Sequence, residues 1–158
     1  MKKINLTINI NHYQKDELPP VDSCLVEKAI EATNNAYAEY SRFYVGAAVL
    51  LEDGTIVTGA NQENAAFPSG LCAERTALFA AQANYPHQSV ACIAIAARNE
   101  NGLLKEPISP CGACRQVMVG VEDRYHKPMR VLLYGTNGVY ELSSACLLYT
   151  SDAADDLT

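Results

Sequence analysis

The fold is decided by residues 90–97, which read VACIAIAA. This run is apolar throughout and bounded by polar residues, which is typical of a central strand buried on both faces. An alanine-rich segment with helical spacing precedes it at residues 72–83, and a second short helix is predicted at residues 111–121. Helices that alternate with buried strands indicate an α/β fold with helices on both faces of a mixed sheet.

Further elements are predicted on both sides of this central strand. Two dipeptides typical of hairpin turns, Asp53-Gly54 and Asn137-Gly138, each separate a pair of short strands. The remaining elements are a helix at 22–39 and strands at 44–51, 55–58, 131–134 and 139–142. Together they predict a three-layer α/β/α sandwich around a five-stranded mixed sheet, with a loop at residues 99–110.

The start of the chain carries an additional strand prediction. Ile4, Leu6, Ile8 and Ile10 alternate with polar residues, which is the pattern of a half-buried strand. The basic first residues are not followed by the continuous apolar core of a secretory signal. We therefore expect an extra N-terminal strand and a cytoplasmic protein.

Composition narrows the classes of partner. The chain has 158 residues, enough for one domain with its own core, and its formal charge is −6 from 12 basic and 18 acidic residues. An acidic chain without a basic run is not expected to bind nucleic acid. No apolar stretch approaches the roughly 18 residues of a membrane helix, so no membrane partner is expected. A small molecule in a pocket is the predicted ligand.

The cysteines predict a metal centre. Cys111 and Cys114 form a C-x-x-C pair at a helix start, and Cys72 opens another candidate helix. If the two helix starts lie side by side, three thiolates converge on one zinc ion and leave a fourth position for water, which is a catalytic arrangement. Three alternatives stay open: structural zinc with His87 as a fourth ligand, a redox pair, and inert thiols.

Two neighbours of Cys72 fit a catalytic centre. Glu74 lies close enough in sequence to reach a zinc-bound water and to move protons between that water and a leaving group. Arg75 can offset the net negative charge of zinc with three thiolates. The competing interpretations are a first-turn glutamate favoured by the helix dipole and an ordinary surface arginine.

With these residues in place, the chain resembles the zinc nucleoside deaminases, most closely cytidine deaminases of the small homotetrameric kind. The resemblance spans roughly residues 22–145. The motifs that carry it are FYVGAA at 43–48, NQENA at 61–65, CAERTA at 72–77 and PCGACRQ at 110–116. The chemistry of this class of enzyme, a three-cysteine zinc site with a glutamate that is not a ligand, fits the residues above.

The resemblance implies a role for each matching residue. Zinc would be held by Cys72, Cys111 and Cys114, with Glu74 as the proton shuttle and Arg75 beside the sulfurs. Substrate would be contacted by Phe43, Asn61, Glu63, Ala65 and Ala73. Asn61 and Glu63 would bind the ribose 3′-hydroxyl, and Phe43 would pack on the pyrimidine ring. Without the resemblance, a solvated Asn/Glu loop and a core phenylalanine would be the better interpretations.

The resemblance also implies the reaction. We expect hydrolytic deamination of cytidine and 2′-deoxycytidine to uridine and 2′-deoxyuridine, a step of pyrimidine salvage, in a homotetramer whose neighbouring subunit reaches the sugar near Ala65. Two alternatives remain: a deaminase of another small molecule such as blasticidin S, and a zinc-binding protein without catalysis.

Two parts of the chain, Phe67 and the C-terminal residues, depart from the family. Phe67 stands where relatives often have tyrosine, and Leu147-Leu148 are followed by Tyr149-Thr150 rather than by proline and an aromatic residue. Residues 146–155 also match, in one reading frame, the translation of a transposase-derived adapter used in sequencing libraries. We therefore expect one domain at 1–145 and a non-native tail at 146–158; the alternative is a natural acidic, disordered tail. A non-native ending could weaken substrate binding or assembly.

Overall fold

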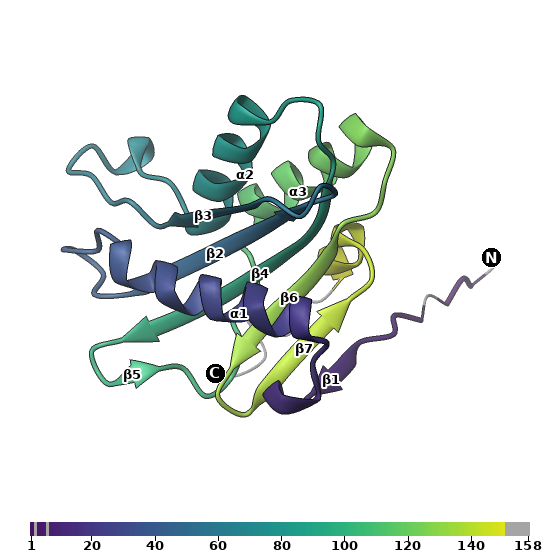
Figure 1. Ribbon diagram of the computed structural model, residues 1–158, viewed down its shortest axis with the longest axis horizontal. Coiled ribbons are helices and arrows are strands. Elements are labelled where there is room, and N and C mark those ends of the chain that lie inside the picture. The colour runs from purple at the N-terminus through teal and green to yellow at the C-terminus, as the bar shows by residue number, and fades with distance from the viewer. Residues whose placement is uncertain (2, 6, 151–158) are drawn as a thin grey trace.

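The structure is a computed structural model that describes residues 1, 3–5 and 7–150. Its centre is a mixed sheet with the strand order β1-β7-β6-β4-β2-β3, and a short β5 pairs with β4 (Figure 1). The strands are β1 (Asn11–Tyr13), β2 (Tyr44–Leu51), β3 (Ile56–Ala60), β4 (Val90–Asn99), β5 (Gly102–Leu103), β6 (Arg130–Gly135) and β7 (Gly138–Leu142). The helices are α1 (Pro20–Ala32), α2 (Ala73–Asn84) and α3 (Gly112–Tyr125).

The predicted three layers are confirmed. Figure 1 shows α1 crossing one face of the sheet, with α2 and α3 together on the other. Successive residues of β4 alternate between the two layers: Ile93 packs in the core cluster with α2 and α3, whereas Ala94 packs in the cluster with α1. β4 and β6 pair in parallel and the other pairs are antiparallel, so the sheet is mixed as expected.

Two segments differ from the sequence prediction. The helix expected at 22–39 ends at Ala32, because Thr33 begins a 3-10 turn, Thr33–Asn35, in a stretch of poor helix formers. The segment 99–110, expected to be a loop, contains β5, which extends the sheet beside the end of β4. The sheet consequently has seven strands rather than five plus one.

The N-terminal strand lies later in the chain than the alternation predicts. Residues 3–5 and 7–10 form no strand, and the side chains of Ile4 and Ile10 are 77% and 46% exposed, while Leu6 lies outside the described residues. The strand forms instead at Asn11–Tyr13, which pairs with the edge strand β7. Alternation alone does not say which residues reach a partner strand, so the prediction of a strand at 4–10 was wrong in position.

The end of the described chain packs against the core. Residues Ala145–Thr150 form a 3-10 helix, and the Leu148 side chain is fully buried in the cluster beneath α2 and α3. Arg115 of α3 donates a hydrogen bond from Nη1 to the carbonyl oxygen of Leu148, at 3.0 Å. Residues 151–158 lie outside the described residues, and a non-native origin of 146–158 stays a prediction. Within the described chain, no helix has the length and apolar character needed to cross a membrane.

Candidate metal centre and active site

Two helix starts meet at the candidate centre. Cys72 is the residue that caps the start of α2, Cys111 caps the start of α3, and Cys114 lies in the first turn of α3. The three Sγ atoms lie within 4.8 Å of one another, with 3.8 Å from Cys72 to Cys111 and 3.5 Å from Cys111 to Cys114. The convergence of three sulfurs predicted from the motif spacing is confirmed.

Close packing of α2 on the sheet sets the position of Cys72. A Cβ atom added to Gly59 of β3 would overlap the backbone nitrogen of Ala77 and would also lie against the carbonyl oxygen of Ala73. Only glycine lets the first turns of α2 approach β3 this closely. The helix start that carries Cys72 is therefore held by the core of the protein rather than by a loop.

The donor set fits zinc. Thiolate sulfurs are preferred zinc ligands, and helix starts lower the pKa of cysteine thiols. Hydrogen bonds from the Cys114 thiol and from Arg75 lower the pKa of Cys72 to about 5. Sharing its proton with Cys72 raises the pKa of Cys114, so one thiolate forms readily within the cluster. Three protein sulfurs leave the fourth zinc position available for chemistry.

Glu74 is a buried acid beside this cluster. It lies in the first turn of α2 and is only 4% exposed. Burial raises the pKa of Glu74 to about 7, because a carboxylate loses its hydration inside the protein. A carboxyl group that is poised between its two protonation states near neutral pH suits proton transfer.

Arg75 lies beside the Cys72 sulfur, where it can offset the net negative charge of zinc with three thiolates. Its Nη2 donates to Cys72 Sγ at 3.6 Å, and the Cys72 sulfur in turn raises the pKa of Arg75. The Nε atom is buried and has no hydrogen-bond partner within the described part of the chain. An ordinary surface arginine would not be arranged in this way.

A cavity of about 370 Å³ opens at the metal centre. Its size is in the range of small-molecule sites. It is lined by Asn61, Gln62, Glu63, Asn64, Phe67, Pro68, Gly70, Leu71, Cys72 and Arg75. The structure thus brings two of the expected substrate residues, Asn61 and Glu63, to the same cavity as Cys72 and Arg75.

The other three expected substrate residues are not among the described residues that line this cavity. Phe43 is half-buried and packs against the core cluster of α2 and α3. Ala65 is exposed on the loop between β3 and α2, and Ala73 is fully buried at the start of α2. Their roles in substrate binding stay predictions.

Sequence reasoning did not assign six of the lining residues to the site, and two of these six, Gln62 and Leu71, pair with each other. They form an isolated bridge in which each backbone N–H donates to the other's carbonyl oxygen, at 2.9 and 3.0 Å. The bridge joins the two ends of the segment 62–71, which lines much of the cavity. Two single residues that pair across a loop leave no periodic pattern, so the sequence carried no signal for them.

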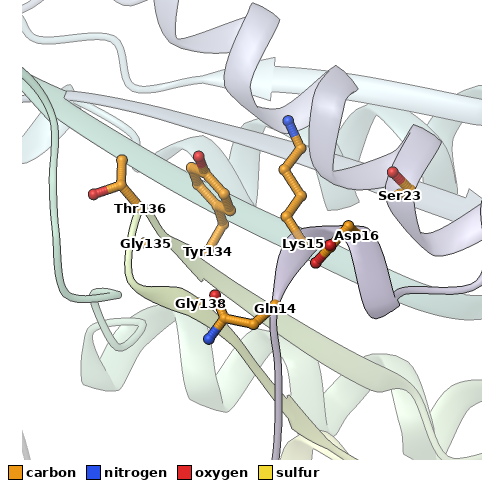
Figure 2. Close-up of a pocket in the computed structure, with 8 residues that line it drawn as sticks. All are labelled: Gln14, Lys15, Asp16, Ser23, Tyr134, Gly135, Thr136 and Gly138. Carbon is orange, nitrogen blue, oxygen red and sulfur yellow. The ribbon is translucent and has the colours of Figure 1, made fainter.

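A second cavity, of about 450 Å³, lies between the N-terminal 3-10 turn Lys15–Glu17 and the β6–β7 turn (Figure 2). Tyr134 and Lys15 project into this space, and the lysine ammonium is paired with Glu27. The metal-ligating cluster found among the described residues is at the other cavity. The cavity at Cys72 is therefore the candidate catalytic cavity.

Comparison with known proteins identifies the family. The model of the "Cytidine and deoxycytidylate deaminase zinc-binding region" matches residues 20–126. This chain belongs to that family. The deaminase match includes both helix starts and all three sulfurs of the cluster. Zinc is the cofactor of this deaminase, and the donor set described above is suited to hold it.

Relatives of this deaminase include curated and solved proteins. The cytidine deaminase of Halalkalibacterium halodurans is 50% identical over 94 residues, which is 60% of this chain and 67% of the relative. That of Sporosarcina psychrophila is 40% identical over 135 residues, covering 85% of this chain and 93% of the relative. The crystal structure of cytidine deaminase from Burkholderia pseudomallei matches with a TM-score of 0.66 and 40% identity, covering 79% of this chain and 93% of that one.

Proposed function

We propose that this deaminase catalyses the zinc-dependent hydrolytic deamination of cytidine and 2′-deoxycytidine to uridine and 2′-deoxyuridine, as a step of pyrimidine salvage. The observation that carries the proposal is Glu74, a nearly fully buried acid next to three converging sulfurs. A zinc site with a purely structural role does not require a buried acid beside the metal. Relatives named cytidine deaminase, at 40% to 50% identity, support the choice of substrate.

Glu74 is the proposed proton carrier. Cys72, Cys111 and Cys114 would hold zinc, which when bound brings the pKa of water toward neutrality. Glu74 would take a proton from the water that attacks C4 and deliver it to N3 of the pyrimidine ring. It would then move the proton of the new C4 hydroxyl to the amino group, so that C4 becomes a carbonyl as the C4–N bond breaks and ammonia leaves. A pKa of about 7 lets Glu74 both accept and donate protons near neutral pH.

Arg75 would tune the charge at the metal. Zinc with three thiolates carries a net negative charge, which disfavours the loss of a proton from water. The guanidinium bond to Cys72 Sγ withdraws part of that charge from the sulfur. We therefore assign Arg75 a supporting role and not a contact with substrate.

Substrate contacts and assembly are proposed from the family resemblance together with the cavity. Asn61 and Glu63 would bind the ribose 3′-hydroxyl and Phe43 would pack on the base, with Ala65 and Ala73 close to the nucleoside.

Phe67 is 83% exposed at the cavity wall, and a large exposed aromatic side chain favours contact with another subunit. A homotetramer that completes the site near Ala65 is the proposed assembly, in the cytoplasm, where thiols stay reduced.

The test is the ultraviolet change of cytidine with the zinc-loaded protein beside Glu74→Ala and Glu74→Gln at equal zinc content. We expect turnover by the unchanged protein and a loss of at least about 100-fold in both variants, because neither side chain can carry a proton. Turnover that survives in Glu74→Ala would contradict the role of Glu74. No turnover in any of the three, even with a Leu-Leu-Pro-Phe ending in place of residues 147–150, would contradict the proposed function.

A further inference from the structure

Phe43 lies on the loop at residues 36–43, between the 3-10 turn Thr33–Asn35 and β2. This loop runs along the cavity segment 61–63, and backbone hydrogen bonds connect the two. Near its start, Tyr37 donates to the carbonyl of Asn61 at 3.0 Å and accepts from the N–H of Glu63 at 2.8 Å. Near its end, the Asn61 N–H donates to the carbonyl of Val45 at 3.2 Å. The loop is therefore anchored at both ends to the residues expected to bind the sugar.

The Asn61 side chain adds a second connection, directly at Phe43. Its Oδ1 accepts from the Val45 N–H at 2.8 Å, and its Nδ2 donates to the Phe43 carbonyl at 2.9 Å. The amide therefore spans the backbone on both sides of Tyr44. An amide group still has one N–H and one lone pair free for a ligand after these two bonds.

The Glu63 side chain holds the other half of the loop. Its Oε2 accepts from the backbone N–H groups of Tyr40 at 2.8 Å and Ser41 at 3.3 Å. Neither of these two backbone bonds uses Oε1, which can also accept hydrogen bonds. Hydrogen bonds from Ser41 and from the Tyr40 N–H lower the pKa of Glu63, in keeping with an acceptor that is ionised.

Between these two connections the backbone is strained. Arg42 has a φ of +54°, in the left-handed region that disfavours residues with a Cβ atom. Strained residues persist where their surroundings over-determine the backbone. Here Glu63 fixes Tyr40 and Ser41 on one side, and Asn61 fixes Phe43 and Val45 on the other side.

We propose that Asn61 and Glu63 are positioning residues for Phe43, in addition to being ligands of the sugar; this inference rests on the proposed nucleoside site. The two side chains hold Arg42 in its strained conformation and so place the aromatic ring before substrate arrives. Asn61 and Glu63 both line the cavity. Recognition of the base and recognition of the sugar are consequently coupled through one loop, and the coupling acts in both directions.

A ligand without the 3′-hydroxyl distinguishes a positioning role of Glu63 from a role in sugar contact alone. We would measure the Kd values of 2′-deoxyuridine and 2′,3′-dideoxyuridine by calorimetry with the zinc-loaded chain, because these products bind without reacting. Glu63→Ala is expected to weaken both ligands, 2′,3′-dideoxyuridine by roughly ten-fold, the factor that matches a left-handed residue's conformational cost. Glu63→Gln keeps an oxygen that can accept from both amides and should retain most of the 2′,3′-dideoxyuridine affinity.

Arg42 supplies the decisive pair of variants. Arg42→Gly removes the left-handed cost, so in the Glu63→Ala background it should restore several-fold of the affinity for 2′,3′-dideoxyuridine. Arg42→Ala removes the same guanidinium and its ion pair with Glu100 but keeps the Cβ atom, so it should restore nothing. If Glu63→Ala leaves 2′,3′-dideoxyuridine affinity unchanged, or if both Arg42 variants act alike, the coupling is overturned. If the unchanged protein binds neither ligand, the proposed nucleoside site fails, and the coupling fails with it.

Discussion

Two buried carboxylates in this protein have opposite surroundings. Glu74 at the start of α2 is 4% exposed and forms no ion pair within the described part of the chain, whereas Asp22 of α1 is 2% exposed and accepts two hydrogen bonds from Arg130. Burial raises the pKa of Glu74 to about 7, and the nearby Arg75 guanidinium lowers it only in part. Asp22 instead raises the pKa of Arg130 and joins α1 to β6.

The difference separates the proposed catalytic end, at the starts of α2 and α3, from a structural edge formed by β1, β7 and β6. At the catalytic end, helix starts bring sulfurs and an acid together. At the N-terminal edge, Arg130 also bonds Glu141 at 2.8 Å, and Glu141 accepts from Asn11 and Tyr13 of β1. A buried acid is available for proton transfer where no cation is paired with it, and it is a structural connection where one is. Changes at the two ends should therefore affect different properties.

The largest effect is expected from Cys114→Ser at the catalytic end. A serine hydroxyl is a poor zinc ligand compared with a thiolate, and two cysteines do not complete the site. Bound zinc, measured by atomic absorption, should fall from one per chain to near zero, and activity should fall by at least about 1,000-fold. Cys24→Ser, at an exposed cysteine of α1, is the control and should leave zinc unchanged. Full zinc content in Cys114→Ser would contradict the assigned ligand set.

The next effect tests whether core packing holds the catalytic end. Gly59→Ala places a Cβ atom against the backbone of α2, so α2 must shift. We expect the free energy of unfolding to fall by about 3 kcal/mol, with loss of zinc affinity, measured by denaturant titration and competition with a chelator. The control is Gly120→Ala in α3, where no atom lies within 4 Å of the new Cβ, and stability should rise by about 0.5–1 kcal/mol. Equal stabilities of the two variants would show that α2 is not held at Gly59.

The two regions also differ in how far the sequence could predict them. The metal centre could be predicted because Cys72 and Glu74 lie in one motif and Cys111 and Cys114 in another, so each half is fixed within one helical turn. The buried run VACIAIAA likewise predicted the central strand β4. These features depend on neighbours along the chain.

The N-terminal edge could not be predicted in the same way. The contact of Glu141 with Asn11 joins residues that are 130 positions apart in the sequence, and no local pattern announces it. For that reason the alternation at residues 4–10 indicated a strand but not its place, which the pairing with β7 decides. The roles of Asn61 and Glu63 in holding the Phe43 loop were hidden for the same physical reason.

A smaller effect is expected from Asp22→Ala at the structural edge. The change leaves Arg130 without its buried partner, so the free energy of unfolding should fall by about 2 kcal/mol, less than for a fully buried pair because Arg130 is 37% exposed. The kcat for cytidine, measured on the folded zinc-loaded protein, should stay within about two-fold, since the network does not reach the cavity at Cys72. A large loss of kcat with unchanged stability would mean that this edge acts on the active site.

The smallest effect is a pH dependence at Glu141. Burial alone would raise its pKa, but hydrogen bonds from Asn11, Arg130 and Tyr13 outweigh burial and lower the pKa of Glu141. A lowered carboxyl pKa adds stability that is fully present above the unfolded value of about 4.3 and is lost as the pH falls through the folded value. Zinc is also released in acid, so the pH dependence must be read from the difference between two proteins that share the metal site.

The comparison is therefore between the unchanged protein and Glu141→Gln, by urea unfolding at a series of pH values. The unchanged protein should be more stable by about 1–2 kcal/mol at neutral pH, because glutamine cannot provide charge-assisted bonds to Arg130. This gap should narrow as the pH falls below about 4, where the unchanged Glu141 becomes neutral as well. A gap that stays constant into acid would mean that Glu141 contributes through shape rather than charge, and the edge would then owe its stability to packing and strand pairing.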